Sequence, residues 1–211
     1  VPHVIFLSCT VMYHSQKKKI KEINLDLNKE IYPNYFGGAW MKLFSEKMCE
    51  FYSRLKKNKY TVIRHSNIYG PFDKFDLLKS HVFGATMTKI LKSENNKINI
   101  WGNGKEKRDL LFVDDLSKFI NLAILKQKSN FEIFNVGYGN SITINDLAKK
   151  IGKHAKKKII LKHDLSKKSL KTNVVLDCNK AKKILGWKKT FSLDKGILKT
   201  IKWYNKNIIN K

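Results

Sequence analysis

Side chains that could carry out acid–base chemistry are concentrated in a few short stretches of this chain. Lys42 and Glu46 stand four residues apart, so they share one face of a helix and could form a simple ion pair. Small polar residues precede them in Ser8-Cys9-Thr10 and follow them in Arg64-His-Ser-Asn-Ile-Tyr-Gly-Pro71 and Ser80-His81-Val82. Cysteine, serine, threonine and histidine can transfer protons or hydrogen-bond a reacting group. These stretches are therefore the candidates for a functional site.

The hydrophobic pattern predicts the elements that would position these residues. The run HVIFLSCTVMY (3–13) is typical of a buried strand, and residues 39–55 have apolar side chains at helical spacing. YTVIRHSNIYGP (60–71) predicts one strand that ends in a Gly-Pro turn. Residues 81–91 predict another helix, with His81 at its start.

The alternation of strands and helices continues to the end of the chain. A strand is predicted at 98–101, and RDLLF predicts a strand followed by a helix that is capped near Asp115. Gly186 would end a short helix in DCNKAKKILGW, and a last helix begins near Ser192. Further elements are predicted in FEIFNVG (a strand), SITINDLAKKIGKHA (an N-capped helix) and KKIILKH (a strand). Short strands that alternate with helices favour a parallel α/β sheet.

The formal charge of +26 first suggests a nucleic-acid-binding protein, because basic patches neutralise phosphates. The charge, however, is almost entirely lysine, with Arg54, Arg64 and Arg108 as the arginines. It is spread along the chain, and aromatic residues do not interleave with the lysine runs as stacking platforms would. We therefore expect a lysine-rich solvated surface. A polyanionic ligand is compatible with it, and nucleic-acid binding is disfavoured.

Cysteine usage and hydropathy indicate the compartment. Cys9, Cys49 and Cys178 are odd in number and not spaced for a metal site, which favours a reducing cytoplasm over a disulfide scaffold. No apolar run approaches the ~18 residues needed to cross a bilayer. We therefore expect a cytoplasmic protein with no membrane partner and no metal.

The polar stretches occur in an order that resembles one protein family. NIYGP, SHV, and WGNG followed by Arg108-Asp109 form a specific combination, although each motif alone is a weak signal. In this order the chain resembles the extended short-chain dehydrogenase/reductase family, the NAD-dependent nucleotide-sugar epimerases and dehydratases, and most of all its GDP-sugar branch. The likeness covers essentially the whole chain but only the C-terminal two thirds of the family pattern. About a hundred residues of βαβ units, at roughly 30 residues each, would precede Val1.

The resemblance implies an α/β fold, made of the C-terminal portion of a Rossmann-type parallel sheet plus a small α/β substrate-binding domain. The first part would comprise residues 1–70 with returning segments near 110–136, and the second part 71–113 and 137–211. The family's glycine-rich phosphate loop between a first strand and helix is absent, and Trp101-Gly-Asn-Gly104 is wrongly placed to serve. NADP(H) is the implied cofactor, but we expect the chain alone to bind it poorly.

The resemblance also implies catalytic roles. Lys42 matches a lysine that lowers the pKa of a tyrosine acid and binds the nicotinamide ribose. Gly38 stands where that tyrosine is expected, and Tyr35, three residues upstream, is the candidate replacement. His81 matches the histidine that shuttles protons at the carbons beside the keto group of the sugar.

Two alignments of the first strand are open. If Tyr13 is the anchor, Cys9 takes the position of a hydroxyl that bonds the C4 oxygen of the sugar, and Val11 takes that of a proton-shuttling cysteine. If Ser8-Cys9 is the anchor, Cys9 is the shuttling cysteine and the strand gains a residue. Thr10 is a further candidate hydroxyl. In a strand it would point away from Cys9 and Val11, so a bulge would be needed to present both faces.

Contacts to substrate and cofactor follow from the resemblance residue by residue. Arg108 would grip the nucleotide diphosphate, for which a guanidinium fork is suited. Asn67 would lie near the sugar, and Lys89 and Lys167 would be further basic contacts of the substrate. The residues that would line the nicotinamide are His65, Ser66 and Ile68, together with Lys42.

The implied function is epimerisation of a keto-sugar nucleotide at C3 and C5, followed by NADPH reduction at C4, with a GDP-sugar favoured. We expect impaired catalysis by this chain alone, because the tyrosine acid and the phosphate loop are missing. The alternatives are a non-catalytic sugar-nucleotide-binding partner chain and, with less support, a basic nucleic-acid-binding protein. A homodimer and a separate N-terminal half are the expected protein partners.

Overall fold

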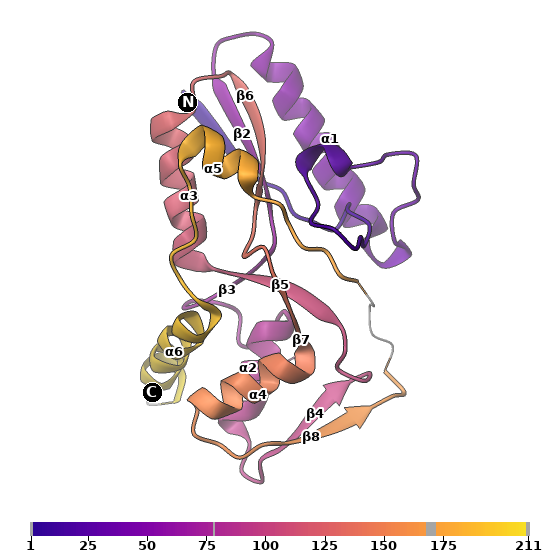
Figure 1. Cartoon of the computed structure of the whole chain (residues 1–211), viewed down its shortest axis with the longest axis vertical. Helices are drawn as coiled ribbons and strands as arrows, with labels where there is room; N and C mark the ends of the chain where they lie inside the picture. The colour runs from indigo at the N-terminus through magenta and orange to yellow at the C-terminus, as the bar shows by residue number, and fades with distance from the viewer. Residues whose placement is uncertain (1, 78, 168–171, 210–211) are drawn as a thin grey trace.

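The computed structural model describes residues 2–77, 79–167 and 172–209, and it has two lobes, one above the other in Figure 1. The elements of the upper lobe are β1 His3–Leu7, α1 Phe36–Ser53, β2 Lys59–His65, α3 Val113–Lys126, β6 Phe131–Val136 and α5 Asn179–Leu185. The strands form a parallel sheet in the order β1-β2-β6. α1 lies along one side of this sheet, and α3 and α5 lie along the other (Figure 1).

The lower lobe contains two short sheets and the helices that cover them. Its elements are β3 Asn67–Tyr69, α2 Val82–Lys92, β4 Lys97–Trp101, β5 Lys107–Phe112, β7 Ser141–Thr143, α4 Ile144–His154, β8 Ile160–Asp164, α6 Leu193–Tyr204 and the terminal turn η3 Asn205–Ile209. β5 pairs with β3 in parallel and with β7 in antiparallel, while β4 and β8 form a separate parallel pair. α4 packs against both α2 and α6.

Strand β5 connects the hydrophobic cores of the two lobes. Successive side chains of a strand point to opposite faces. Leu110 and Phe112 accordingly enter the lower core with Phe83, while Leu111 enters the upper core with Phe119. The fold is therefore the mixed α/β architecture with parallel strands that the sequence predicts, and β5 packs into the cores of both lobes.

The chain crosses between the lobes at Ser66, which corrects one prediction. The stretch 60–71 is two strands rather than one, because β2 ends at His65 and β3 begins at Asn67. The Ser66 amide still donates to the Val136 carbonyl of β6, and the next residue pairs with β5 instead. The polar residues that follow β2 therefore lie at the junction of the two lobes.

Strand β1 is shorter than predicted. It ends at Leu7, and the Tyr13 amide donates to the Thr10 carbonyl at 3.0 Å, which closes a turn. The Ser8 hydroxyl donates to the Glu46 carboxylate of α1, so the chain turns toward that helix instead of extending the sheet. We call residues 8–13 the cavity turn.

Most predicted helices are confirmed, and one of the predicted caps is wrong. Thr143 and Ser192 cap α4 and α6 through their side chains, and Gly186 ends α5 with a positive φ of 71°. Asp115, in contrast, does not cap α3, which begins after Phe112. Its carboxylate is buried and accepts hydrogen bonds from residues 190 and 191. Within the described ranges, none of the helices is both long and apolar enough to cross a membrane.

Candidate functional site

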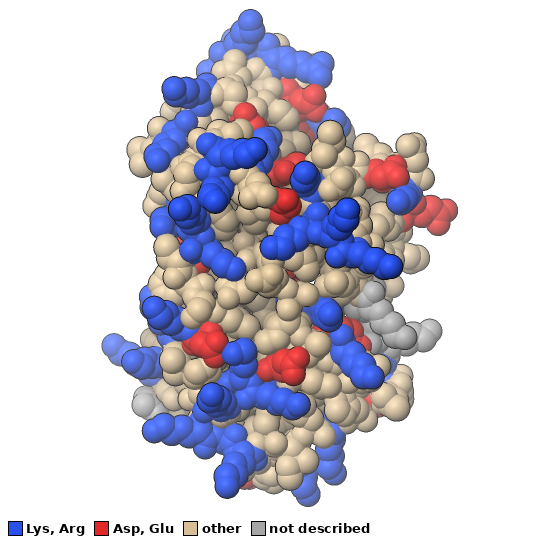
Figure 2. All heavy atoms as spheres, in the orientation of Figure 1, with Lys and Arg blue, Asp and Glu red and all other residues tan. Residues whose placement is uncertain are grey.

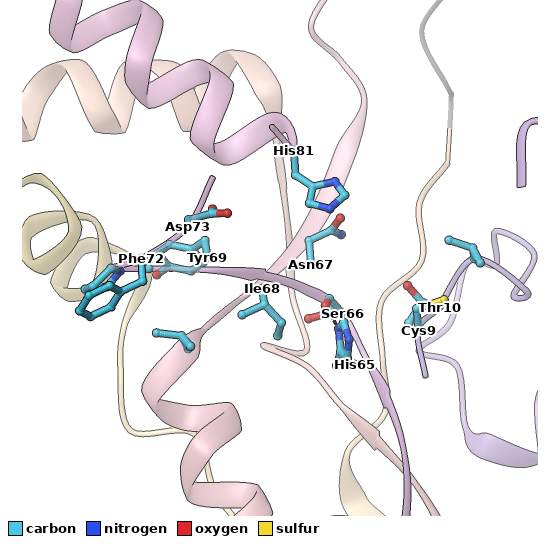
Figure 3. A pocket seen from close by; sticks show the side chains of 14 residues that line it. Cys9, Thr10, His65, Ser66, Asn67, Ile68, Tyr69, Phe72, Asp73 and His81 are labelled. Carbon is cyan, nitrogen blue, oxygen red and sulfur yellow. Dashed lines mark hydrogen bonds between the residues drawn. The ribbon is translucent and has the colours of Figure 1, made fainter. Parts of the chain in front are cut away.

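A cavity of about 460 Å³ lies where the two lobes meet (Figure 3). Its walls come from the cavity turn, from the crossing between β2 and β3 with the loop that follows, and from the start of α2. The predicted site residues that line it are Cys9, Thr10, His65, Ser66, Asn67, Ile68 and His81. The cavity turn follows β1 and His65 ends β2, so the cavity lies at the carboxyl edge of a parallel sheet, where α/β proteins bind ligands.

The cavity turn presents consecutive residues to the same space. Cys9, Thr10 and Val11 all line the cavity, although a strand would alternate them between two faces. The turn removes that alternation, so no bulge is needed. Under either alignment of this segment, Cys9, Thr10 and Val11 all reach the cavity. The two alignments therefore differ only in the chemical role that they assign to each residue.

Burial raises the pKa of the Cys9 thiol above its ordinary value, and the charge of Lys42 offsets part of this shift. Each unit by which the pKa rises lowers the thiolate fraction about tenfold, and the thiolate is the nucleophile. We predict that Cys9 is alkylated more slowly at pH 8 than free cysteine, and that its rate still rises above pH 9. Peptide mass spectrometry after timed iodoacetamide treatment measures this rate. A rate that has levelled off by pH 8 would contradict the prediction.

The crossing between β2 and β3 forms the floor of the cavity. The His65 ring nitrogen Nδ1 lies 2.8 Å from the Ser66 carbonyl, and burial lowers the pKa of His65, so its ring is neutral at pH 7. Asn67 donates from Nδ2 to the Asp109 carbonyl at 3.2 Å. Because Ile68 also faces the space, the floor is mixed, with apolar and uncharged polar groups.

His81 stands at the opposite wall, where α2 begins. It is the N-cap residue of α2 but makes no capping bond through its side chain, which faces the cavity (Figure 3). Asp73 lines the same wall and was missed by the sequence reasoning. One of its carboxylate oxygens accepts from the Lys74 amide, the other is buried with no hydrogen-bond partner in the described part of the chain, and burial raises its pKa. Its position two residues after NIYGP was the available signal.

A second, smaller cavity of about 60 Å³ adjoins the first. The two share Thr10, Val11 and Asn67 in their walls. Tyr35 and Arg108 line the smaller one, and the Arg108 guanidinium donates to the Lys107 carbonyl at 2.8 Å. The structure thus places Tyr35 and Arg108 beside the main cavity and not inside it.

Lys42 lies close to the site but outside the lining of both cavities. Its Nζ donates to the Leu7 carbonyl at 2.6 Å and lies 4.9 Å from the centre of the Phe6 ring. The expected ion pair with Glu46 is replaced, because the Glu46 carboxylate bonds Arg64 instead. At Gly38 an added Cβ would meet no atom within 4 Å, so the position has room for a larger side chain.

The other two predicted substrate contacts lie farther from the site. Lys89 lines a different cavity, where its Nζ donates to the Asn99 carbonyl at 3.0 Å and burial lowers its pKa. Lys167 is exposed at the end of β8, next to residues 168–171, which lie outside the described ranges. The structure therefore does not bring these two lysines to the cavity.

The residues present fit one end of a nicotinamide dinucleotide. His65, Ser66 and Ile68 offer a neutral wall for a nicotinamide ring. Glycines also follow β6, but there the amides of Tyr138 and Gly139 already donate to the Asp109 carboxylate at 2.7 and 3.1 Å. A carboxylate at that loop would repel a pyrophosphate. No group of three or more potential metal ligands occurs in the part of the chain that the structure describes.

Fold and site together define a Rossmann-type α/β protein whose polar site lies at the carboxyl edge of its sheet. The model of the NAD dependent epimerase/dehydratase family matches residues 1–137, which is more than half of the chain. The chain therefore belongs to this family.

Several relatives of the chain are nucleotide-sugar enzymes. The chain is 31% identical over 172 residues to GDP-L-colitose synthase of Yersinia pseudotuberculosis, an alignment that covers 80% of this chain and 56% of that protein. It is 28% identical over 218 residues to GDP-L-fucose synthase of Escherichia coli strain K12, covering 98% and 68% of the two chains. The chain thus spans roughly half to two thirds of the length of such relatives.

Solved structures show the same fold. UDP-glucose 4-epimerase of Thermotoga maritima, solved with UDP-glucose, aligns with a TM-score of 0.85 and 27% identity over 99% of this chain and 65% of its own. The NADP-bound GDP-L-fucose synthetase of Naegleria fowleri aligns with a TM-score of 0.87 over 98% and 67% of the two chains. At 19% identity, this second likeness concerns the fold alone.

Proposed function

We propose that the chain is the substrate-binding portion of a nucleotide-sugar epimerase/reductase of the GDP-L-fucose synthase type. The observation that carries the proposal is the single cavity lined by Cys9, Thr10, Asn67 and His81, with Arg108 in the adjoining space. This set combines proton-transferring groups with a cation suited to a diphosphate. A sugar in the larger cavity would reach Arg108 through its diphosphate.

The proposed reaction inverts C3 and C5 of a 4-keto-6-deoxy sugar and then reduces C4. The keto group acidifies the hydrogens on both flanking carbons, so Cys9 and His81 on opposite walls can remove and return protons there. The Thr10 hydroxyl would hydrogen-bond the C4 oxygen. When bound, NADPH supplies the hydride for the reduction, with His65, Ser66 and Ile68 along the nicotinamide. The family's NAD dependence supports a nicotinamide cofactor of this kind.

Gly38 supports a second candidate, a sugar-nucleotide-binding chain with weak or no catalysis. A glycine cannot donate the proton that the C4 oxygen needs during reduction. Tyr35 is the nearest replacement on the same segment, and it shares a cavity with Thr10. Binding of the sugar nucleotide does not require this proton donor, so the two candidates differ in turnover and not in affinity.

Cofactor binding would need further polypeptide. In the described part of the chain, β1 pairs with β2 alone, so its outer edge can accept another parallel strand. The relatives are longer than this chain, since the alignments cover 56% of GDP-L-colitose synthase of Yersinia pseudotuberculosis and 68% of GDP-L-fucose synthase of Escherichia coli strain K12. We propose that an N-terminal α/β half with a phosphate-binding loop pairs with β1, either on the same or on a separate polypeptide.

We predict that the chain binds GDP-mannose in calorimetric titration and binds NADPH weakly or not at all. Arg108→Ala should weaken GDP-mannose binding about 100-fold, because charge-assisted hydrogen bonds to the diphosphate are lost. Arg54→Ala is the matched control, since Arg54 is an exposed arginine of the turn after α1 that pairs with Glu50. Unchanged binding by Arg108→Ala, or no binding by the wild type, would contradict the proposal.

Nucleic-acid binding is tested with the same proteins. Figure 2 shows basic side chains spread over the whole visible face, with acidic ones between them, rather than gathered in one stripe. Affinity for duplex DNA that falls steeply with salt and is the same in Arg108→Ala would favour the nucleic-acid alternative.

We also propose that the chain forms a homodimer through α1. On its side away from the sheet this helix and the turn after it expose large apolar side chains, namely Phe36, Trp40, Met41, Phe44, Phe51, Tyr52 and Leu55. A contiguous apolar row of this size usually marks an interface. We predict a dimer mass in light scattering that Phe44→Glu shifts to a monomer, whereas Lys47→Glu on the same helix does not. A wild type that is monomeric at every concentration would exclude this dimer.

A further inference from the structure

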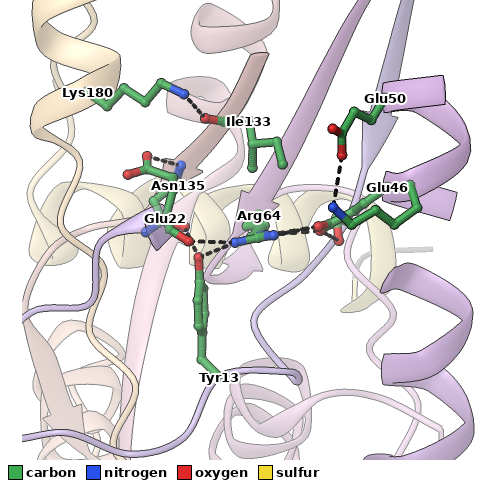
Figure 4. Close-up of polar contacts among 10 residues, drawn as sticks. Tyr13, Glu22, Glu46, Glu50, Arg64, Ile133, Asn135 and Lys180 are labelled. Carbon is green, nitrogen blue, oxygen red and sulfur yellow. Dashed lines mark hydrogen bonds and ion pairs between the residues drawn. The ribbon is translucent and has the colours of Figure 1, made fainter. Parts of the chain in front are cut away.

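A buried ion pair joins β2 to α1 next to the cavity turn (Figure 4). The Arg64 guanidinium contacts the Glu46 carboxylate with Nη2 at 2.6 Å from Oε2 and Nε at 3.0 Å from Oε1. The two side chains are only 5% and 3% exposed. A buried pair is weak evidence for stability, because desolvation of the two charges can exceed their attraction. Its other contacts therefore indicate what it does.

The pair holds both ends of the cavity turn. At one end the Ser8 hydroxyl donates to Glu46 Oε1 at 2.6 Å. At the other end Arg64 Nη1 donates to the Tyr13 hydroxyl oxygen at 2.8 Å. Residues 9–11, which line the cavity, lie between these two anchors. The position of the turn thus depends on one guanidinium and one carboxylate.

Further hydrogen bonds attach the pair to the rest of the upper lobe. Arg64 Nη1 also donates to the Glu22 carbonyl at 3.0 Å, and the Tyr13 hydroxyl donates to Asn135 Oδ1 at 2.9 Å (Figure 4). Burial raises the pKa of Tyr13 to about 12, so this hydroxyl keeps its proton and can both accept and donate. Asn135 lies on β6, and its backbone amide donates to the Glu22 carboxylate. The network is therefore fixed to the sheet.

The same pair relates the turn to Lys42. Glu46 follows Lys42 by one turn of α1, and the Lys42 ammonium donates to the Leu7 carbonyl just before Ser8. α1 thus bonds two successive residues, Leu7 at the end of β1 and Ser8 at the start of the cavity turn, one through each side chain. A shift of Glu46 would move the turn relative to the lysine.

We propose that Arg64 is the positioning residue of the cavity turn, and that it sets, through Glu46 and Tyr13, where Cys9 and Thr10 stand relative to Lys42. A planar guanidinium reaches two acceptors at fixed angles, whereas a lysine ammonium cannot hold the carboxylate and the phenol at once. The importance of this geometry for catalysis rests on the function proposed above. The geometry itself can be tested without any sugar.

Cys9 serves as the local reporter in the test. Arg64→Lys and Tyr13→Phe should each increase the iodoacetamide alkylation rate of Cys9 roughly tenfold or more, because one lost charge-assisted hydrogen bond frees one end of the turn. The rate at Cys178 should stay unchanged, since this thiol bonds Gly137, which follows β6, and both variants keep the ring at position 13 whose apolar cluster Cys178 joins. Arg54→Lys, which alters an exposed arginine pair of α1, should change neither rate.

Two results would overturn the proposal. If the alkylation rates of Cys9 and Cys178 rise together, in proportion to the loss of global stability, the Arg64–Glu46 pair has only a structural role. If neither rate changes in variants that are folded by circular dichroism, Arg64 does not position the turn. Should Arg64→Lys fail to fold, Tyr13→Phe decides, because it leaves the ion pair intact. Absence of sugar binding would not affect these rates, so a failure of the proposed function remains distinguishable.

Discussion

Replacing Arg64 with methionine should lower the free energy of unfolding by about 3–5 kcal/mol, because the Glu46 carboxylate is then buried without its partner. Methionine retains much of the length and apolar volume of the side chain, so the loss of charge and donors dominates. The Tyr13 hydroxyl would also lose the hydrogen bond that it accepts from Arg64. Urea denaturation followed by circular dichroism measures the change.

The matched control for Arg64 is Arg54→Met. Arg54 also pairs with a glutamate, at 3.0 Å, but its side chain is 73% exposed. We expect this variant to cost less than about 0.5 kcal/mol, as exposed pairs usually do. The double variant Arg64→Met/Glu46→Met should be more stable than Arg64→Met alone, because no unpaired charge remains. If Arg64→Met and Arg54→Met cost the same, the stability argument fails.

Asp109→Asn should lower the free energy of unfolding by about 2–4 kcal/mol, because it turns an amide donor toward buried backbone donors. One oxygen of Asp109 accepts from the Tyr138 amide at 2.7 Å, and the other accepts from the amides of Gly139 and Leu176 at 3.1 and 3.3 Å. The side-chain oxygen of an asparagine can accept from the backbone amides on one side, but its NH₂ group would face backbone N–H groups on the other side. The carboxylate therefore joins β5 to two separate loops.

Asp114→Asn is the control for Asp109. Asp114 forms an exposed ion pair with Lys199 at 2.9 Å, so its loss should cost less than about 1 kcal/mol. Denaturation curves of both variants, measured at the same pH, test the difference. A loss below about 1 kcal/mol in Asp109→Asn would mean that the loops find other acceptors.

The cavity combines residues from both lobes, so the proposed substrate site does not depend on a single lobe. Cys9 and Thr10 come from the upper lobe, while His81 comes from the lower one. The crossing at Ser66 and the shared strand β5 hold these walls together within the described residues. By contrast, the free edge of β1 lies on the upper lobe, where the proposed cofactor-binding half would join.

The local pattern of the sequence predicted most elements, because the signals that define them are local. Apolar spacing predicted α1, and capping residues such as Ser192 and Gly186 predicted the helix ends. Polar motifs also predicted which stretches would meet, since seven of the named residues line one cavity. The roles assigned to these residues stay predictions.

The errors arose where contacts distant in sequence overrule the local pattern. Residues 3–13 read as one strand, but the bond from Ser8 to Glu46, 38 residues away, accompanies the end of β1 at Leu7. Lys42 and Glu46 share a helix face, yet Arg64 on β2 takes the carboxylate. Asp115 had the place of a cap, but residues 190 and 191 bring their amides to it.

The sequence by itself thus determined the order of strands and helices, the lysine-rich surface and the polar stretches of the site. Only the tertiary structure decided that Cys9, Thr10 and Val11 lie in a turn and all face one cavity. It also decided that the Arg64–Glu46 pair bonds both ends of this turn. The physical reason is that a buried charge is stable only beside an opposite charge or hydrogen-bonding groups, and these can come from any part of the chain. Such a partner leaves no periodic signal in the chain, so packing alone reveals it.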